Sequence, residues 1–364
     1  MKRIIVCSSS LTYHPRFCLK PFLQLKVMSK LPTRKIGNTD VTAIGYGAMG
    51  ISAFYGQVQA DEERFKMLDA VYESGCTNWD TADIYGDSEE LIGNWFKRTG
   101  KRNEMFIATK FGNTPGRDKF VTGDPEYVKE ACAKSLRLLG VDQIDLYYMH
   151  RADQTIPIEK TVGAMAELVK EGKVKYIGLS EVSEKTLRRA HAVHPIAALQ
   201  IEYSPFVLDI ERPDVGLLSA CRELGVAVVA YSPLGRGLLT GRYKSPDDFE
   251  EDDFRRTVPK FSKENFPNIL KVVDEIKAVG DAHGAPPSTT TLAWLLAQGE
   301  NIIPIPGTRS VKYLKENMAA CRLQLKPEEV EEVRKIAQRA EKEVKGDRYA
   351  QQMMGTTLAD TPEL

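Results

Sequence analysis

The sequence lacks the features that are typical of nucleic-acid-binding and membrane proteins. Its 364 residues include 50 Lys and Arg against 50 Asp and Glu, so neither charge is in excess. Binding to nucleic acid or anionic lipid through overall charge needs an excess of cations. No apolar run approaches the roughly 18 residues that span a bilayer. We therefore expect no nucleic-acid partner and no membrane partner.

Clustered cysteines are also lacking. The six cysteines form no Cys-x-x-Cys pair, and none has a histidine at zinc-finger spacing: Cys7, Cys18, Cys76, Cys132, Cys221 and Cys321. This scatter disfavours a disulfide framework and a structural zinc ion. We expect reduced thiols in an intracellular protein and no metal site.

The first thirty residues differ in composition from the rest. They carry six cations, and no acidic residue comes before Asp40. With the serines at 8–10, this bias resembles a mitochondrial presequence. We expect residues 1–29 to be a disordered extension of a cytoplasmic protein, with Met28 as an alternative start. Mitochondrial targeting by residues 1–28 is the alternative interpretation.

From residue 40 onward, runs rich in β-branched and aromatic residues alternate with segments of helical periodicity. Eight such runs occur, at 43–49, 77–82, 105–110, 144–150, 176–180, 199–203, 227–232 and 302–306. Each is apolar enough to be buried on both faces, which is typical of parallel strands. We therefore predict an α/β fold, a closed (β/α)8 TIM barrel.

Capping signals and connection lengths fit this arrangement. Asp124 stands before Pro125 as a capping residue, Ser183 can cap a later helix, and glycines end several helical patterns. Residues 233–301 make a long loop between the seventh and eighth strands, which either folds over a ligand or is a solvated insertion. Extra C-terminal helices are expected at 311–319 and 327–344. The barrel domain should span 30–345, followed by a tail at 346–364.

A glycine pattern after the first strand invites a different fold. Gly45, Gly47 and Gly50 spell the dinucleotide-binding pattern Gly-x-Gly-x-x-Gly. However, the next helical pattern begins only near Asp61, so the helix start that would hold a pyrophosphate is missing. No tyrosine is followed by lysine four residues later, which excludes the short-chain dehydrogenase pattern. We interpret these glycines as strand-end and turn positions of a barrel.

Polar residues gather at the ends of three neighbouring strands. Asp80 and Tyr85 follow the second strand, Lys110 ends the third and His150 ends the fourth. Chemistry in such barrels lies at the carboxyl ends of the strands, so these side chains should meet at one rim. Lys110 near Tyr85 would lower a phenol pKa that is ordinarily about 10, and Asp80 would keep Lys110 charged. A neutral His150 would hold a carbonyl oxygen beside the phenol while a hydride reaches carbon.

At these residues the sequence resembles the aldo-keto reductase superfamily, in its fungal, plant and bacterial aldehyde reductase branch related to pyridoxal reductase. The resemblance covers residues 31–317 and rests on the motifs DTADIYG, FIATKFG, DLYYMH, YIGLSE, LQIEYSP, AYSPLGRGLLTG and IPIPGTRSVKYLKEN. It implies a catalytic tetrad with Tyr85 as proton donor and with His150 also in contact with the substrate. The tetrad is Asp80, Tyr85, Lys110 and His150.

The same resemblance implies a nicotinamide cofactor, NADPH/NADP+, across the barrel mouth. Tyr231 would stack on the nicotinamide ring, and Arg309 would pair with the 2′-phosphate, so NADPH is expected rather than NADH. Glu181 stands where many relatives have Asn and, when ionised, can only accept, which makes it a candidate acceptor for the carboxamide NH2. The implied cofactor residues are Ser180, Glu181, Gln200, Tyr231, Ser232, Pro233, Leu234, Arg236, Gly307, Thr308, Arg309, Glu316 and Asn317.

Two functions are compatible with these residues. The first is an NADPH-dependent reductase that converts aldehydes, with ketones as a further class, to alcohols. The alternative is a nicotinamide-binding regulatory or interaction subunit resembling the β subunits of potassium channels. A complete tetrad favours turnover of a small-molecule carbonyl substrate. The particular substrate and the oligomeric state have no signal in the sequence.

Overall fold

The structure is a computed structural model that describes residues 30–115 and 119–364. The N-terminal extension expected at 1–29, with Cys7 and Cys18, lies outside the described residues. The other four cysteines are free thiols, and three of them are buried. Residues Leu31–Leu364 form one compact unit.

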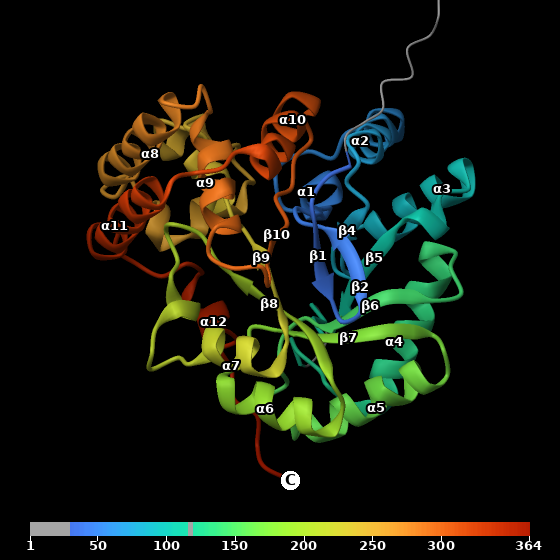
Figure 1. The fold of residues 1–364 in the computed structure, drawn as a ribbon. Coiled ribbons are helices and arrows are strands. Elements are labelled where there is room, and N and C mark those ends of the chain that lie inside the picture. The colour runs from blue at the N-terminus through green and yellow to red at the C-terminus, as the bar shows by residue number, and fades with distance from the viewer. Residues whose placement is uncertain (1–29, 116–118) are drawn as a thin grey trace, which may run out of the picture. The chain divides into compact units, whose positions relative to one another are not determined.

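Eight parallel strands form the predicted barrel (Figure 1). Each of the eight predicted runs overlaps one strand, and neighbours in the chain are neighbours in the sheet. Backbone amides of Gly45 and Gly47 donate to the carbonyls of Pro304 and Pro306 at 2.9 and 3.4 Å, which joins the first strand to the last. The strands are β3 (Tyr46–Gly47), β4 (Asn78–Asp80), β5 (Phe106–Phe111), β6 (Ile144–Met149), β7 (Val174–Ser180), β8 (Ile196–Glu202), β9 (Ala227–Tyr231) and β10 (Ile302–Pro304). The (β/α)8 fold is confirmed.

A hairpin that the sequence analysis missed precedes the barrel. It consists of β1 (Thr33–Ile36) and β2 (Thr39–Thr42), which pair antiparallel. Ile36 and Val41 are buried in one apolar cluster with Phe106, the first residue of β5. Because Phe106 lies at the amino end of its strand, the hairpin covers the end of the barrel opposite the predicted site. Gly37 turns the hairpin at φ +55°, and a Cβ there would lie 2.5 Å from the Tyr176 ring, so only glycine fits.

Helices surround the strands (Figure 1). Both predicted helix caps are confirmed, since Asp124 accepts hydrogen bonds from the amides of Glu126 and Tyr127, and Ser183 accepts one from Thr186. The caps fix where the chain enters two helices that pack on the barrel. In order, the helices up to β9 are α1 (Met49–Ser52), α2 (Asp61–Glu73), α3 (Ser88–Thr99), α4 (Pro125–Leu139), α5 (Ile158–Lys170), α6 (Glu184–Val193) and α7 (Leu217–Leu224).

The long connection between β9 and β10 is part loop and part helix. Short 3-10 turns occupy Gly235–Thr240, Pro246–Asp248, Phe254–Thr257 and Pro259–Phe261. Two helices that the sequence analysis did not identify follow, α8 (Phe266–Asp281) and α9 (Pro287–Leu296). Residues 287–295 of α9 are all buried, so the helix has no polar face that would reveal a helical period.

The chain ends in the two predicted helices and a segment that returns to the barrel. The helices are α10 (Val311–Ala319) and α11 (Pro327–Glu343), and a short α12 (Gln351–Met354) follows. The Ala359 amide donates to the Glu181 carbonyl at 2.9 Å, and the Ser183 amide donates to the Ala359 carbonyl at 3.0 Å. Segment 346–364, expected to follow the domain as a tail, is therefore bound to the loop after β7.

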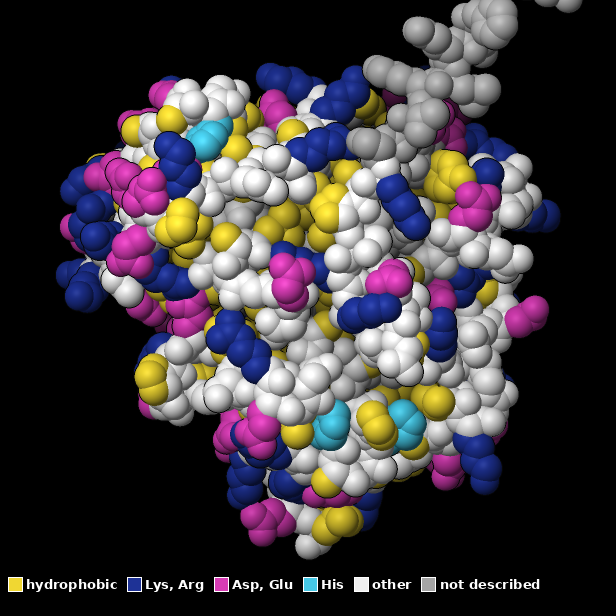
Figure 2. All heavy atoms as spheres, viewed as in Figure 1, with side chains coloured by type: hydrophobic (Ala, Val, Ile, Leu, Met, Phe, Trp, Pro, Cys, Tyr) yellow, Lys and Arg dark blue, Asp and Glu magenta, His cyan; other side chains and the backbone are white. Residues whose placement is uncertain are grey.

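The surface has no dominant charge on the face seen in Figure 2. Basic and acidic side chains are interspersed over it, as the balanced composition predicts. Within residues 30–115 and 119–364, no helix is long and apolar enough to cross a membrane.

Candidate active site

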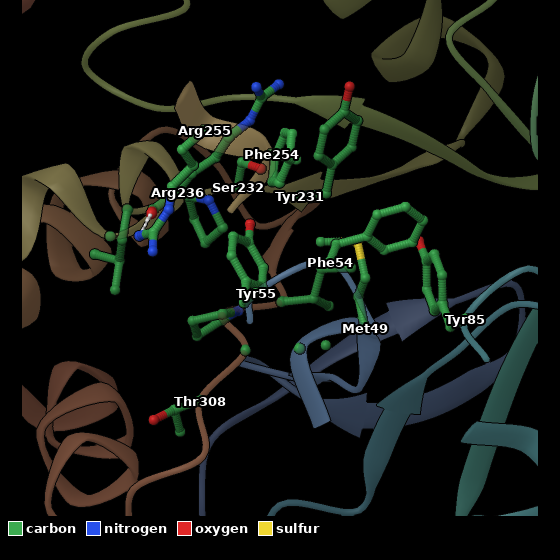
Figure 3. A pocket seen from close by; sticks show the side chains of 18 of the residues that line it. Met49, Phe54, Tyr55, Tyr85, Tyr231, Ser232, Arg236, Phe254, Arg255 and Thr308 are labelled. Atoms are coloured by element: carbon green, nitrogen blue, oxygen red, sulfur yellow. Dashed lines mark hydrogen bonds between the residues drawn. The ribbon is translucent and has the colours of Figure 1, made fainter. Parts of the chain in front are cut away.

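A cavity of about 940 Å³ lies at the carboxyl ends of the strands. Its walls come from the segments that follow β3, β4, β6, β9 and β10, and from the chain's C-terminal segment. Figure 3 shows Tyr231, Ser232 and Arg236 on one side of this cavity, opposite Tyr55 and Tyr85. The rim predicted to carry the chemistry is therefore the rim that holds the cavity.

Lys110 joins the predicted tetrad together. Its side chain is fully buried, because Phe106, Ala108 and Lys110 alternate along β5 and face the barrel interior. The Lys110 ammonium donates to the Asp80 carboxylate, to the Thr81 carbonyl at 2.7 Å and to the Tyr85 hydroxyl at 3.5 Å. Three of the four predicted side chains are thus in direct contact.

His150 completes the group beside Tyr85. The Tyr85 and His150 rings meet edge to face with centroids 5.7 Å apart, and both residues line the cavity at 8% exposure. His150 Nδ1 has no hydrogen-bond partner among the described residues. Phe54 also packs edge to face against Tyr85, with ring centroids 6.3 Å apart (Figure 3).

Burial sets the protonation of these groups. Burial, together with the charges of Lys110 and Arg151, lowers the pKa of His150 well below its usual value, so the imidazole is neutral at neutral pH. Burial lowers the pKa of Lys110 and raises that of Asp80, and each charge opposes the other group's shift. Burial and the Asp80 charge raise the pKa of Tyr85, which is opposite to the predicted lowering. The prediction was wrong because it counted the Lys110 charge and left out desolvation.

Ser180 and Gln200 line the cavity at the ends of β7 and β8. Gln200 Nε2 donates to the second Asp80 oxygen at 2.7 Å, so the amide also orients the tetrad carboxylate. Ser180 Oγ accepts a hydrogen bond from Arg151 at 3.3 Å. Each side chain therefore has a protein partner that the sequence did not indicate.

Glu181 has a partner that the sequence analysis missed. Its carboxylate is fully buried and makes a two-pronged ion pair with Arg348, at 2.8 and 2.7 Å. The Tyr231 hydroxyl donates to the same carboxylate at 2.7 Å. Although burial alone would raise the pKa of Glu181, the charge and hydrogen bonds of Arg348 lower it to about 2. Arg348 stands 167 positions away in the chain, so no local motif links the pair.

The last residue of β9 and the segment after it line the cavity with all five predicted residues: Tyr231, Ser232, Pro233, Leu234 and Arg236. Ser232 and Arg236 have left-handed backbones, at φ +48° and +55°, which turn the chain sharply there. Arg236 is 6% exposed and donates to Glu202 at 3.1 Å. Its Nη1 has no hydrogen-bond partner within the described parts of the chain.

The segment after β10 also lines the cavity, with Gly307, Thr308, Arg309, Glu316 and Asn317. Among the described residues, the Arg309 side chain makes one hydrogen bond, to the Gln57 carbonyl at 2.8 Å. Glu316 accepts from Ser288 Oγ at 3.2 Å.

Close backbone approach accounts for two of the glycines beside this segment. A Cβ at Gly307 would lie 2.6 Å from the Gly47 carbonyl oxygen, and one at Gly47 would lie 2.6 Å from that of Ile305. The structure therefore confirms that Gly47 serves the barrel closure rather than a dinucleotide-binding helix.

Arginine dominates the charge of the cavity. Among the described residues that line it, five are arginines and two are acidic: Arg151, Arg236, Arg242, Arg255 and Arg309 against Asp80 and Glu316. The sequence analysis did not single out Arg151, which directly follows His150, nor Arg242 of the long connection. Such a cavity attracts polyanions, and its guanidinium groups can make bidentate hydrogen bonds to phosphate groups.

In the described residues, no group of three or more His, Cys, Asp or Glu could hold a metal ion.

The comparisons with known proteins agree on one family. Residues 43–338 match the Aldo/keto reductase family. The chain is 65% identical over 339 residues to aldo-keto reductase str7 of Strobilurus tenacellus, and 49% identical over 339 residues to aldo-keto reductase yakc [NADP(+)] of Schizosaccharomyces pombe. Each alignment covers 92% of this chain and 99% of the relative.

Solved structures show the same fold. The glycerol dehydrogenase AKR11B4 from Gluconobacter oxydans superposes with a TM-score of 0.76 at 29% identity, over 85% of this chain and 95% of that one. The thermostable aldo-keto reductase Tm1743, in complex with the inhibitor epalrestat, gives a TM-score of 0.68 at 30% identity, over 84% and 100% of the two chains. With barrel, motifs and relatives in agreement, this chain belongs to the aldo/keto reductase family of oxidoreductases.

Proposed function

We propose that the protein is an NADPH-dependent reductase that converts aldehydes, and ketones as a further class, to alcohols with Tyr85 as the proton donor. One observation carries the proposal. The Lys110 ammonium contacts both the Asp80 carboxylate and the Tyr85 hydroxyl, and a neutral His150 meets the Tyr85 ring edge to face at the cavity wall. A proton donor, a cation and a neutral hydrogen-bonding imidazole are the groups that carbonyl reduction requires.

The cavity suits a cofactor with several phosphates. It offers five arginines, and Arg236 Nη1 lacks a hydrogen-bond partner among the described residues. In our proposal Tyr231, Arg236 and Arg309 hold the nicotinamide, the pyrophosphate and the 2′-phosphate. The Schizosaccharomyces pombe relative carries NADP(+) in its name, which favours the phosphorylated cofactor. A reduced nicotinamide bound here supplies the hydride.

The protein's own part is to hold the carbonyl oxygen and to deliver a proton. His150 Nε2 and the Tyr85 hydroxyl both hydrogen-bond to that oxygen as negative charge develops on it. The Tyr85 O–H bond then breaks and an O–H bond forms on the substrate, which leaves a tyrosinate beside the Lys110 ammonium. Because Asp80 holds that ammonium in place, the tyrosinate forms next to a fixed positive charge.

The apolar side chains of the cavity indicate the kind of substrate. They include Met49 and Met353 of the short helices α1 and α12, and Phe54, Ile84 and Phe120 of the loops. Phe54 and Phe120 remain 44% and 43% exposed. Such a lining favours an aldehyde with an aromatic or branched apolar body over a small polar sugar.

A panel of aldehydes and ketones, assayed by the loss of NADPH absorbance, tests this proposal. We expect aromatic aldehydes to be reduced fastest, ketones more slowly, and NADH to serve poorly in place of NADPH. The absence of NADPH oxidation with every carbonyl compound of the panel would contradict the proposal, and so would equal rates with NADH.

A further inference from the structure

A buried charge cluster links the C-terminal segment to the predicted cofactor face. Two carboxylates in it come from the ends of β7 and β8, and two guanidinium groups neutralise them. We call it the Arg348 cluster, and it consists of Glu181, Glu202, Tyr231, Arg236, Arg348 and Tyr349. Apart from Tyr231 and Tyr349, its members are at most 6% exposed. Charges at this depth are stable only when they are paired.

Arg348 contacts three carboxylate oxygens of this cluster. Its two terminal nitrogens donate to the two carboxylate oxygens of Glu181. Nη1 also lies 3.2 Å from Glu202 Oε2 and 3.1 Å from the Tyr231 hydroxyl. Glu202 in turn accepts from Arg236 at 3.1 Å. One side chain from beyond the last long helix therefore orients two residues that the proposed function gives to the cofactor.

Tyr349 reinforces the same arrangement. Its hydroxyl lies 3.0 Å from the Tyr231 hydroxyl, and the Arg236 guanidinium lies 4.3 Å from its ring centroid. Contacts of this kind between a cation and an aromatic face are attractive. Tyr231 and Arg236 are thus each held by two neighbouring residues of the C-terminal segment, directly or through a carboxylate.

We propose that Arg348 is a positioning residue for the nicotinamide cofactor, which it serves by neutralising Glu181 and Glu202 and thereby fixing Tyr231 and Arg236. This inference rests on the proposed function, because it assumes that those two residues bind the cofactor. Loss of Arg348 leaves Glu181 as a buried carboxylate behind the cavity wall. Tyr231 would lose its contact with Arg348, and the uncompensated negative charge would oppose the binding of an anionic cofactor.

The test compares Arg348→Met with a matched control, Arg189→Met. Arg189 also makes a bidentate ion pair with a glutamate, since it donates to the two carboxylate oxygens of Glu159 at 2.7 and 2.7 Å. It also donates to the carbonyls of Thr361 and Pro362 in the C-terminal segment. It contacts no member of the Arg348 cluster in these hydrogen bonds. The dissociation constant for NADPH, read from the cofactor's own fluorescence, is expected to rise at least tenfold in Arg348→Met and to stay within twofold of wild type in Arg189→Met.

A second substitution separates positioning from general damage. Glu181→Gln added to Arg348→Met removes the uncompensated charge while its amide oxygen still accepts from Tyr231, so most of the lost affinity should return. The affinity of Arg348→Met for NADP+ should also approach that of wild type as the pH falls and Glu181 takes up a proton. Wild type should not gain in this way, because Arg348 and Tyr231 hold the pKa of Glu181 at about 2, with Arg151 nearby.

The outcomes distinguish this inference from the proposed function. A wild-type protein that binds no NADPH would contradict the proposed function itself. A wild type that binds NADPH, with Arg348→Met within twofold of it, would overturn only the inference, and so would a double variant that regains nothing. If Arg348→Met does not fold, Arg348→Lys replaces it in the test, because lysine keeps the positive charge but cannot make the bidentate hydrogen bonds of a guanidinium group. A dissociation constant raised threefold or more supports the inference, and an unchanged one overturns it.

Discussion

At the scale of single residues, the meeting of the four proposed catalytic side chains at one rim was predictable because they end or follow neighbouring strands. Parallel strands bring their carboxyl ends to one rim, so Asp80, Lys110 and His150 could be assigned to it from the sequence. Their protonation was harder to predict, because burial and the Asp80 charge raise the pKa of Tyr85. Arg348 could not be predicted at all, since its partner Glu181 lies 167 residues away with no shared pattern.

The pH dependence of the reaction follows from these shifts. A raised pKa keeps the Tyr85 hydroxyl protonated, as donation requires, until the pH rises above the ordinary value for tyrosine, and a lowered pKa keeps His150 neutral until the pH falls below that for histidine. The kcat for reduction should therefore stay level between about pH 6.5 and about pH 9. A profile of kcat measured with saturating NADPH checks this. An inflection inside the range that disappears in His150→Gln would count against a neutral imidazole.

The choice between cofactors should depend on Arg309. Its side chain is held only by one hydrogen bond to the Gln57 carbonyl in the described structure, so it is free to meet a phosphate, and its loss costs the fold little. Arg309→Ala should raise the KM for NADPH by about tenfold to a hundredfold, the range of a charge-assisted pair, and leave the KM for NADH nearly unchanged. Steady-state kinetics with both cofactors measure this. Equal increases for the two would assign the phosphate to another arginine.

At the scale of elements, predictability followed from the pattern that each segment carries. Helix α4 has a capping aspartate, a proline at its start and an apolar stripe, and all three were visible in the sequence. Helix α9 is buried on every side and has none of these signals, so it was missed. The β1–β2 hairpin was missed because its strands have four residues each, too few for alternation to stand out.

The cap on α4 makes a measurable contribution to stability. Asp124 is exposed and its carboxylate accepts hydrogen bonds from two first-turn amides at 3.0 and 3.2 Å. Asp124→Ala should lower the free energy of unfolding by about 1 kcal/mol, the usual worth of such a cap. Asp124→Asn keeps an acceptor oxygen and should be close to wild type. Urea denaturation of the three proteins compares them, and an alanine variant as stable as wild type would show that the cap is dispensable.

At the scale of the whole molecule, the barrel was predictable and its boundaries were less so. Eight alternating units fix the topology because right-handed crossovers leave few alternatives. The C-terminal segment looked like a tail, because it has no strong periodicity, yet Ala359 pairs with the loop after β7 and Tyr349 lines the cavity. Segment 346–364 thus belongs to the site through tertiary contacts that a local pattern does not reveal.

The compact unit of residues 31–364 contains every residue of the candidate site. A chain of residues 28–364 should therefore fold and reduce aldehydes with a kcat/KM within about twofold of the full chain, since it retains the whole barrel and its core. Purification of both chains and steady-state assays with one aldehyde check this. Loss of NADPH binding in the shorter chain would show that residues 1–27 contribute to the site.

In the proposed reaction, Tyr85 is the group that gives its proton to the substrate oxygen. Tyr85→Phe keeps the ring and its packing against His150 and Phe54 and removes only the hydroxyl. With NADPH and the best aromatic aldehyde, we expect kcat to fall by about 10²–10⁴-fold, the range of general acid catalysis, while the dissociation constant for NADPH stays within about threefold. A variant that keeps its kcat within threefold of wild type would contradict the account.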